Sequence, residues 1–383
     1  MKCKLEDIVD VTMGQSPKSE YYNTEGKGYP FLQGNRTFGF KYPTFDTYTT
    51  VMTKPANAGD VIMSVRAPVG DLNITPVDMC LGRGVCSLRM KNGNQDFLFY
   101  MMKYYIPHLL KKESGTVFGS VNRNDINGLE VDIPEDAQVQ KKIARYLEMI
   151  DDKIELNNAI NNNLEQQAIA LFKSWFIDFE PFNRQVPKTW INGVLGNFVE
   201  IKRGGSPRPI QNFLSDSGFH WLKISDATGI SSPFINEIKE YIIEAGLKKT
   251  VYLKSGSLVL SNSATPGLPK ILDIDTCIHD GWLYFPSSKF SNEYLYLYFK
   301  HIRDNLIALG NGSVFTNLKT DILKNYPTYL PTEDVLKKFD GLVQPIFSMI
   351  LSKTREIKRL AEIRDTLLPK LMSGELDVSD IEL

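Results

Sequence analysis

Two stretches that lie far apart in the chain are nearly the same: SGTVFGSVNRNDINGLEVDIP (Ser114–Pro134) and NGSVFTNLKTDILKNYPTYLP (Asn311–Pro331). A Gly, a Val-Phe pair, an Asp-Ile pair and a final Pro recur in the same order, with one residue dropped on the way. Agreement of this length predicts that the chain forms one local structure twice.

The repeat extends well beyond these two stretches. LEDIVDVTMGQSP from Leu5 matches LGNFVEIKRGGSP from Leu195, and AGDVIMSVRAPVG from Ala58 matches SGSLVLSNSATPG from Ser255. The period of roughly 190 residues is far longer than the 20–50 residues of solenoid repeats. We therefore interpret the chain as two copies of a complete domain followed by a helix.

The first part of each copy has the pattern of a strand-rich domain. In VIMSVRAPVG, Val61, Met63 and Val65 alternate before the turn residues Pro68 and Gly70. Helical segments such as FLFYMMKYYIPHLL lie between the short apolar runs. We expect each copy to begin with a compact mixed α and β domain.

The second part of each copy has the pattern of one long helix. Neither Pro nor Gly occurs from Ala137 to about Phe176, which predicts a helix of roughly 60 Å at 1.5 Å per residue. In the second copy, Pro345 predicts a kink or a restart near the beginning of the helix. The expected heptad positions are 143, 150, 157, 164 and 171 with 147, 154, 161, 168 and 175 in the first helix, and 339, 346, 353, 360 and 367 with 343, 350, 357, 364 and 371 in the second.

Two such helices in one chain bury each other most economically as an antiparallel pair. The predicted fold is therefore two similar α+β domains separated by two long antiparallel helices that form a coiled-coil-like spacer, with a pseudo-twofold internal repeat. Asn157 and Asn161 fall on the expected seam, where they either mark a solvated section or fix the helix register at some loss of stability. The predicted segments are domain 1 (1–136), first helix (137–180), domain 2 (181–332), second helix (333–375) and tail (376–383).

Composition excludes several classes of protein. The 383 residues are 42% hydrophobic and 23% charged, which is ordinary globular usage. No apolar run reaches the roughly 18–20 residues of a membrane span, and MKCKLEDIVD has no signal-peptide core. The four cysteines show no CxxC spacing, which favours reduced thiols in a cytoplasmic protein over a zinc site or disulfides: Cys3, Cys80, Cys86 and Cys277.

The charge distribution is compatible with nucleic-acid binding but does not by itself predict it. The formal net charge is −1. Residues 1–136 carry 15 Lys and Arg against 16 Asp and Glu, and residues 181–332 carry 16 against 12. Binding to a polyanion depends on a local basic face rather than on the total, and the second domain forms such a face more readily.

The residues that catalysis would require are not in the sequence. Adenine methylation needs a cofactor loop and an Asn/Asp-Pro-Pro-aromatic motif to hold a flipped base, and neither occurs. No GxxxxGK[ST] loop is present for ATP. The histidines lack metal-ligand spacing, and we interpret the His279–Asp280 pair as a structural or a surface pair. We expect no catalytic residue, metal or cofactor.

Three segments resemble the signature segments of one family. LFKSWFIDFEPF from Leu171, VPKTW from Val186 and IRDTLLPKLMSGEL from Ile363 are similar to those of the DNA specificity subunit of type I restriction–modification systems. The resemblance covers the full domain–helix–domain–helix plan. One departure is that the first domain begins at Leu5 without the PxxW lead-in that precedes the second at Pro187.

The resemblance implies a function. In that family the domains are target recognition domains, each reading half of a split sequence in double-stranded DNA. The helices space the domains and dock two methylation subunits, and restriction subunits join through the complex. Half-sites about 34 Å apart lie on one face of a duplex, which suits two reading heads. Shared residues are then scaffold, whereas differences between the copies read bases, and the chain itself is not catalytic.

Candidate DNA contacts follow from residue chemistry. Arg, Lys, Ser and Asn contact phosphates, Arg reads guanine, and Asn or Gln reads adenine. Arg66 and Arg208 rank first because each lies beside Pro or Gly in a loop. In the first domain the candidates are Asn35, Arg36, Lys41, Arg66, Arg83 and Arg123; in the second they are Lys202, Arg203, Arg208, Lys223, Asn262, Lys270 and Lys319.

Apolar residues of the helix ends have two readings. Trp175 and Phe176 pack against the adjoining domain as core, which we favour, or anchor a methylation subunit as exposed aromatics. The same choice applies to Leu367, Leu368 and Leu371.

Two other functions remain possible from the sequence. The chain could be a free-standing DNA-binding protein, which neighbouring methyltransferase and nuclease genes would argue against. It could also be a self-sufficient methyltransferase, which binding of S-adenosylmethionine by the isolated chain would support.

Overall fold

The chain folds into two compact units in the computed structural model, which describes residues 1–111, 119–310 and 318–378. Unit 1 comprises Met1–Glu155 with Arg359–Leu383, and unit 2 comprises Leu156–Lys358. The recurring Gly and Val-Phe of the two quoted stretches lie outside the described residues. Among the described helices, none has the length and apolar character needed to cross a membrane.

Unit 1 contains three small sheets. The central one is antiparallel, and a second contains one parallel pairing, β4 with β9. The strand orders are β1 (Lys2–Lys4)–β11 (Glu130–Asp132); β2 (Val9–Met13)–β10 (Val85–Met90)–β7 (Val61–Ser64)–β8 (Leu72–Ile74); and β3 (Tyr22–Asn23)–β5 (Tyr48–Thr49)–β4 (Tyr29–Leu32)–β9 (Met79–Leu81)–β6 (Pro55–Ala56).

Unit 2 repeats these orders strand for strand. It again has a parallel pairing at the equivalent place, β15 with β21, and it adds β16 at the edge of the central sheet, where β16 pairs parallel with β20. The orders are β12 (Ile191–Val194)–β23 (Pro327–Leu330); β13 (Lys202–Arg203)–β22 (Trp282–Tyr284)–β19 (Leu258–Ser261)–β20 (Pro269–Leu272)–β16 (Phe234–Ile235); and β14 (Leu214–Ser215)–β17 (Tyr241–Ile242)–β15 (Phe219–Leu222)–β21 (Thr276–Ile278)–β18 (Val251–Leu253).

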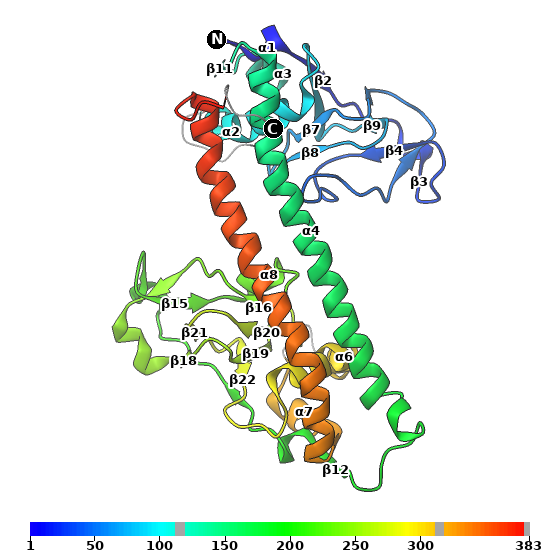
Figure 1. The fold of residues 1–383 in the computed structure, drawn as a ribbon, viewed down its shortest axis with the longest axis vertical. Coiled ribbons are helices and arrows are strands. Elements are labelled where there is room, and N and C mark those ends of the chain that lie inside the picture. The colour runs from blue at the N-terminus through cyan, green and yellow to red at the C-terminus, as the bar shows by residue number, and fades with distance from the viewer. Residues whose placement is uncertain (112–118, 311–317, 379–383) are drawn as a thin grey trace. The chain divides into compact units, whose positions relative to one another are not determined.

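The helices follow the same repeat (Figure 1). α2 and α3 of the first copy correspond to α6 and α7 of the second, and only the second copy has α5 between its strands. The bounds are α1 (Leu5–Ile8), α2 (Gln95–Lys111), α3 (Arg123–Asn127), α4 (Ala137–Phe176), α5 (Ile224–Thr228), α6 (Asn292–Gly310), α7 (Thr320–Lys324) and α8 (Glu333–Ser373), with short 3₁₀ turns at 19–21, 180–182, 195–197, 210–212 and 244–249.

The repeated Asp-Ile pair belongs to a helix start. The Asn122 side chain accepts hydrogen bonds from the backbone N–H groups of Asn124 and Asp125, which caps α3. Asp125 accepts in return from the Asn122 N–H at 2.9 Å, and Ile126 is fully buried. The Asp-Ile pair recurs because a short helix begins at this place in each domain, but only α3 has a side-chain cap, and Lys319 makes no such bond at the start of α7.

α4 and α8 are the two long helices that the sequence predicts, at 40 and 41 residues. The restart expected at Pro345 is wrong, because α8 continues through this residue. Pro345 is exposed, and the residue four positions earlier is Gly341, whose surroundings are open. Both residues lie on the exposed side of α8, where the lost hydrogen bond leaves no polar group in the core.

The buried stripe of α4 differs from the expected one on one side. Leu147, Ile154 and Ala168 are buried as expected, but the other line is shifted by one residue and contains Asp151 and Glu165. On the expected line Ile143 is buried, but Ile150, Leu164 and Leu171 are only half-buried. Heptad counting searches for apolar residues, so it passed over the two carboxylates that occupy the buried positions.

Each unit closes its core with parts of both long helices. In unit 1, Ile143 and Leu147 of α4 join Leu371 and Met372 of α8 in one cluster with the central sheet and α2. In unit 2, residues 168–176 of α4 join residues 336–350 of α8 against α6. Within each unit the two helix segments run in opposite directions, which confirms the predicted mixed α and β domains with antiparallel long helices.

Candidate nucleic-acid interface

Three loops of unit 1 meet at one point and bring three predicted arginines together. The Val65 N–H donates to the Gly84 carbonyl, and the Val121 N–H donates to the Val65 carbonyl, both at 2.9 Å. Arg66, Arg83 and Arg123 are each next to these bonds or two residues away. We call these three side chains the unit 1 patch.

The unit 1 patch is unneutralised. All three guanidinium side chains are on exposed residues, and none forms an ion pair with another residue in the described ranges. A surface guanidinium without a carboxylate partner remains available to a phosphate or to a guanine edge. This arrangement fits DNA better than it fits an internal structural role.

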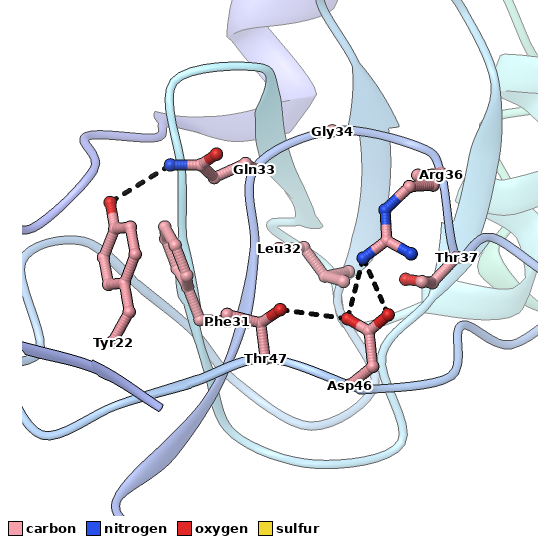
Figure 2. Close-up of a pocket in the computed structure, with 9 residues that line it drawn as sticks. All are labelled: Tyr22, Phe31, Leu32, Gln33, Gly34, Arg36, Thr37, Asp46 and Thr47. Atoms are coloured by element: carbon pink, nitrogen blue, oxygen red, sulfur yellow. Dashed lines mark hydrogen bonds and ion pairs between the residues drawn. The ribbon is translucent and has the colours of Figure 1, made fainter. Parts of the chain in front are cut away.

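The unit 1 groove adjoins the patch and is shown in Figure 2. It has a volume of about 300 Å³ and includes the end of β4 and the segment that follows. The Gln33 amide donates to the Tyr22 hydroxyl at 3.1 Å, and the Tyr22 ring lies 4.7 Å from that of Phe31. Gln33 thus projects an adenine-compatible amide at the groove wall.

Backbone contact joins the groove to the patch. A Cβ on Gly84 would lie 2.1 Å from the Gln33 carbonyl oxygen, so only glycine fits there. A Cβ on Gly82, on the other side of Arg83, would lie 2.7 Å from the Gln33 Cα, which is also too close. The two glycines of LGRG therefore let the backbone on both sides of Arg83 pack directly against Gln33.

An ion pair also lines the unit 1 groove. The Arg36 guanidinium donates to both carboxylate oxygens of Asp46, at 2.7 and 2.9 Å (Figure 2). This hydrogen bonding holds the pKa of the Asp46 carboxyl below its usual value. Asn35 donates to Asp71 at 2.5 Å. Both candidates therefore already have partners, unlike the arginines of the patch.

Unit 2 builds the same meeting point with different charges. The Asn262 N–H donates to the Gly281 carbonyl at 2.8 Å, and the Leu318 N–H donates to the Asn262 carbonyl at 2.7 Å. These bonds bring Asp280 and the exposed Lys319 together. Asp280 stands where unit 1 has Arg83, because LGRG aligns with IHDG.

Asp280 accepts hydrogen bonds from two arginines. Arg203 donates to the Asp280 backbone carbonyl, and Arg208 donates to its carboxylate at 3.2 Å. The Ser206 hydroxyl also donates to this carboxylate at 2.6 Å and, as the largest cause, lowers the pKa of Asp280. Asp280 is therefore ionised near neutral pH and offsets part of the local positive charge. We call Arg203, Arg208 and Asp280 the unit 2 patch.

The unit 2 groove is larger, at about 810 Å³. Lys223 occupies the position of Gln33 and pairs with Glu240, whereas Trp221 replaces Phe31. Burial lowers the pKa of His279, whose Nδ1 accepts from the Gly281 N–H at 2.8 Å. The groove combines an aromatic wall with a lysine and the exposed Arg208.

Two predicted contacts are buried instead of presented. Lys41 and Lys270 are each only 2% exposed. Lys41 pairs with Glu148 at 3.0 Å, and the Lys270 ammonium donates to the backbone carbonyls of Ile230 and Ser232 at 2.6 Å. Their long alkyl stems let them fill an internal position, so neither offers charge to DNA here. Lys202 is exposed but pairs with Glu200, and Asn262 is buried with one donor bonded to Asp280.

The partner-binding candidates lie mostly in the cores. Phe176 and Leu371 are buried, and Trp175, Leu367 and Leu368 pack half-buried against the same clusters. Sequence reasoning missed the apolar side chains that are exposed on the long helices. These residues lie seven apart in sequence, or a multiple of seven, on each helix: Met149 and Leu156 on α4, and Leu342, Met349 and Ile363 on α8.

Comparisons with known proteins point in one direction. A family model described as the type I restriction modification DNA specificity domain matches residues 1–166 and 187–356. The MjaIX specificity subunit of Methanocaldococcus jannaschii is 25% identical over 99% of this chain and 94% of its own length. The HindI specificity subunit of Haemophilus influenzae is 26% identical over 84% and 88%.

A solved structure supports the fold independently. The S subunit of a type I restriction–modification system from M. genitalium superposes with a TM-score of 0.62. The match covers 97% of this chain and 96% of that one at 15% identity. At this identity the likeness establishes the shared fold.

Proposed function

This chain belongs to the type I restriction modification DNA specificity family, and from that premise we propose that each of its units reads one half of a split double-stranded DNA site. The observation that carries the proposal is the meeting point of three loops, built by equivalent backbone hydrogen bonds in both units. It holds basic side chains in each case, beside a groove with an amide or a lysine. A constant frame with variable polar groups is what two different half-sites require.

Within each unit, the two features divide the work. The arginines of the unit 1 patch, with Lys319 and the unit 2 patch, contact phosphates and nearby base edges. Gln33 in one groove and Lys223 in the other occupy one position of the repeat and read different bases, with adenine suited to the amide and guanine to the ammonium. Specificity then resides where the copies differ.

The long helices carry the assembly function in this proposal. Exposed apolar residues at heptad spacing are unusual on a solvated helix and fit an apolar helix of a partner. We assign the exposed residues of α4 and α8 as docking points for two methylation subunits, with Trp175, Leu367 and Leu368 supporting them from the half-buried edge. Restriction subunits would join through that complex. The chain contributes recognition, and its partners contribute the catalysis.

The decisive experiment is a base-resolution map of methyladenine. This chain is expressed with its neighbouring methylation gene in a host that lacks DNA methylation. We expect a split motif with a fixed gap, and we expect the double variant Arg66→Ala/Arg83→Ala to lose or relax one half only.

Lys27→Ala is the matched control, because Lys27 is exposed in the same unit and pairs locally with Glu25. It should leave the motif unchanged. No methylation by an assembled complex that contains the unaltered chain would contradict the proposal and favour a free-standing DNA binder.

A further inference from the structure

A buried carboxylate of α4 ties three helices of unit 1 together. Asp151 is 1% exposed, and its Oδ2 accepts from the Tyr100 hydroxyl at 3.0 Å and from the Lys103 ammonium at 3.4 Å, both on α2. Its Oδ1 accepts from Arg364 of α8 at 2.9 Å. We call these four residues the unit 1 clamp.

Unit 2 has a clamp of the same chemistry. Glu165 of α4 is 6% exposed, and its Oε1 accepts from the Tyr296 hydroxyl at 2.6 Å and from the Lys300 ammonium at 2.5 Å, both on α6. The Tyr296 ring also packs edge-on against Phe347 of α8, with centroids 5.4 Å apart. Glu165, Tyr296 and Lys300 form the unit 2 clamp.

The domain-helix parts of the two clamps, on α2 and α6, lie at one place in the repeat. QDFLFYMMK of α2 aligns with NEYLYLYFK of α6, so Lys103 and Lys300 are equivalent. In each helix a tyrosine three or four residues earlier lies on the same face and supplies the hydroxyl. The carboxylates lie on α4 in both cases, fourteen residues apart, which is two heptads. Both domain helices therefore present a tyrosine and the equivalent lysine to a buried carboxylate of α4.

The chemistry suits positioning better than stabilisation. Burial raises the pKa of Tyr100 and of Tyr296, so both hydroxyls remain donors. Buried ion pairs contribute little net stability because desolvation opposes their attraction, but the charged groups tolerate only one geometry. An apolar contact would allow a domain helix to slide along α4, whereas a clamped carboxylate does not.

We propose that the two clamps are positioning devices that fix each recognition domain at one register on the long helices, and thereby set the gap between the DNA half-sites. This inference rests on the proposed function. Tyr100, Lys103, Tyr296 and Lys300 are then specificity determinants, although none of them faces the patches or grooves.

The test replaces the whole unit 2 clamp, so that no charge is left buried without a partner. In the methylation map, the variant Glu165→Gln/Tyr296→Phe/Lys300→Met should keep both half-sites. Methylation at gaps one base pair longer or shorter should rise by about tenfold over the unaltered chain, which corresponds to about 1.4 kcal/mol of lost discrimination. The control Glu333→Gln/Lys337→Met removes an exposed pair of α8 and should keep a single gap.

A second measurement separates this inference from the proposed function. Spin labels at Gln166 of α4 and Asp304 of α6, both exposed residues of unit 2, report the distance between these helices in the free chain. We expect one narrow distance distribution in the unaltered chain and a broader one in the triple variant. If the unaltered chain directs no methylation, the proposed function fails. The spin-label distances then still show whether the clamp fixes α6 against α4. A single gap, or an unchanged distribution, in a folded triple variant would overturn the inference.

Discussion

Units 1 and 2 place the same three loops together but pair their basic side chains differently. Unit 1 has Arg66, Arg83 and Arg123 on exposed positions without a carboxylate partner in the described residues. Unit 2 puts Asp280 in the place of Arg83 and uses it to hold Arg203 and Arg208. The scaffold is thus constant, whereas both the positions of the arginines and their partners differ between the units.

A second pair of equivalent residues shows the same principle inside the domains. Asn73 of β8 and Lys270 of β20 occupy one position of the repeat, and both are buried. Asn73 exchanges two hydrogen bonds with the backbone of Gly39, and Lys270 donates to the carbonyls of Ile230 and Ser232. Each fastens a neighbouring loop, but only the lysine titrates.

Removing free arginines should have the largest effect on DNA binding. We expect Arg66→Ala/Arg83→Ala to weaken binding to the chain's DNA site about 100-fold, because each such contact contributes about 1–3 kcal/mol. The matched unit 2 variant Arg203→Ala/Arg208→Ala should lose only about tenfold, because Asp280 already offsets those charges. Binding titrations at two salt concentrations measure both, with a salt slope reduced by about 2 for the unit 1 variant. Equal losses in the two units would break the comparison.

The buried lysine should make stability depend on alkaline pH. Burial lowers the pKa of Lys270 from 10.5 to about 8. Below pH 8 the folded and unfolded chains both hold the proton. Between about pH 8 and 10.5 the unfolded chain holds more protons, so stability should rise with pH, by up to about 3 kcal/mol at 1.36 kcal/mol per pKa unit.

Urea unfolding at pH 7 and pH 10, for the unaltered chain and for Lys270→Met, isolates this contribution. The difference in unfolding free energy between the two proteins should shift in favour of the unaltered chain at pH 10. If the difference in unfolding free energy does not change with pH, burying the charged Lys270 costs no more than burying the uncharged Asn73.

The two parts of α4 differ in how their buried polar groups are satisfied. The unit 1 part pairs Asp151 with Arg364, whereas in unit 2 both amide atoms of Asn157 and the Asn161 oxygen are buried without a hydrogen bond. We expect Asn157→Leu/Asn161→Leu to stabilise the chain by about 1–2 kcal/mol and to permit register slip. Thermal melting with light scattering tests this. A lower melting temperature with an unchanged state of association would contradict it.

Freeing the tethered arginines should have the smallest effect. Asp280→Asn keeps a similar shape and removes the charge that Arg208 contacts. We expect DNA binding to tighten by about threefold to tenfold and its salt slope to steepen by about 1. Weaker binding would show that Asp280 orders the arginines rather than restraining them. Ser206→Ala, which removes only the neighbouring hydroxyl, is the control.

Much of the architecture could be predicted because it follows from residue patterns that occur twice in the sequence. The uninterrupted heptads of residues 137–176 and the doubled turn residues predict the helices and the duplicated domains. Pro345 was misread because its effect depends on whether it lies on the exposed side of the helix, which the proline itself does not reveal. The stripe of α4 was misplaced because Asp151 and Glu165 are buried by partners on α2, α6 and α8.

The candidate interface could be predicted only in part. Residue chemistry selected Arg66, Arg83 and Arg123, but their meeting depends on hydrogen bonds between loops far apart in sequence. Lys41 and Lys270 have the same chemistry and lie inside, because burial is a property of the fold. Gln33 was passed over because nothing local marks it, although the glycines of LGRG packed against it were a visible signal.

The composite make-up of unit 1 has a consequence for synthesis. Its core includes Leu371, Met372 and Val378, which are translated more than two hundred residues after α4 begins. At about 5–20 residues per second, the N-terminal domain waits on the order of tens of seconds on the ribosome for these side chains. The second domain, whose parts are contiguous, therefore completes its core before the first. During that interval the nascent chain exposes apolar side chains of the first domain, which chaperones would have to shield.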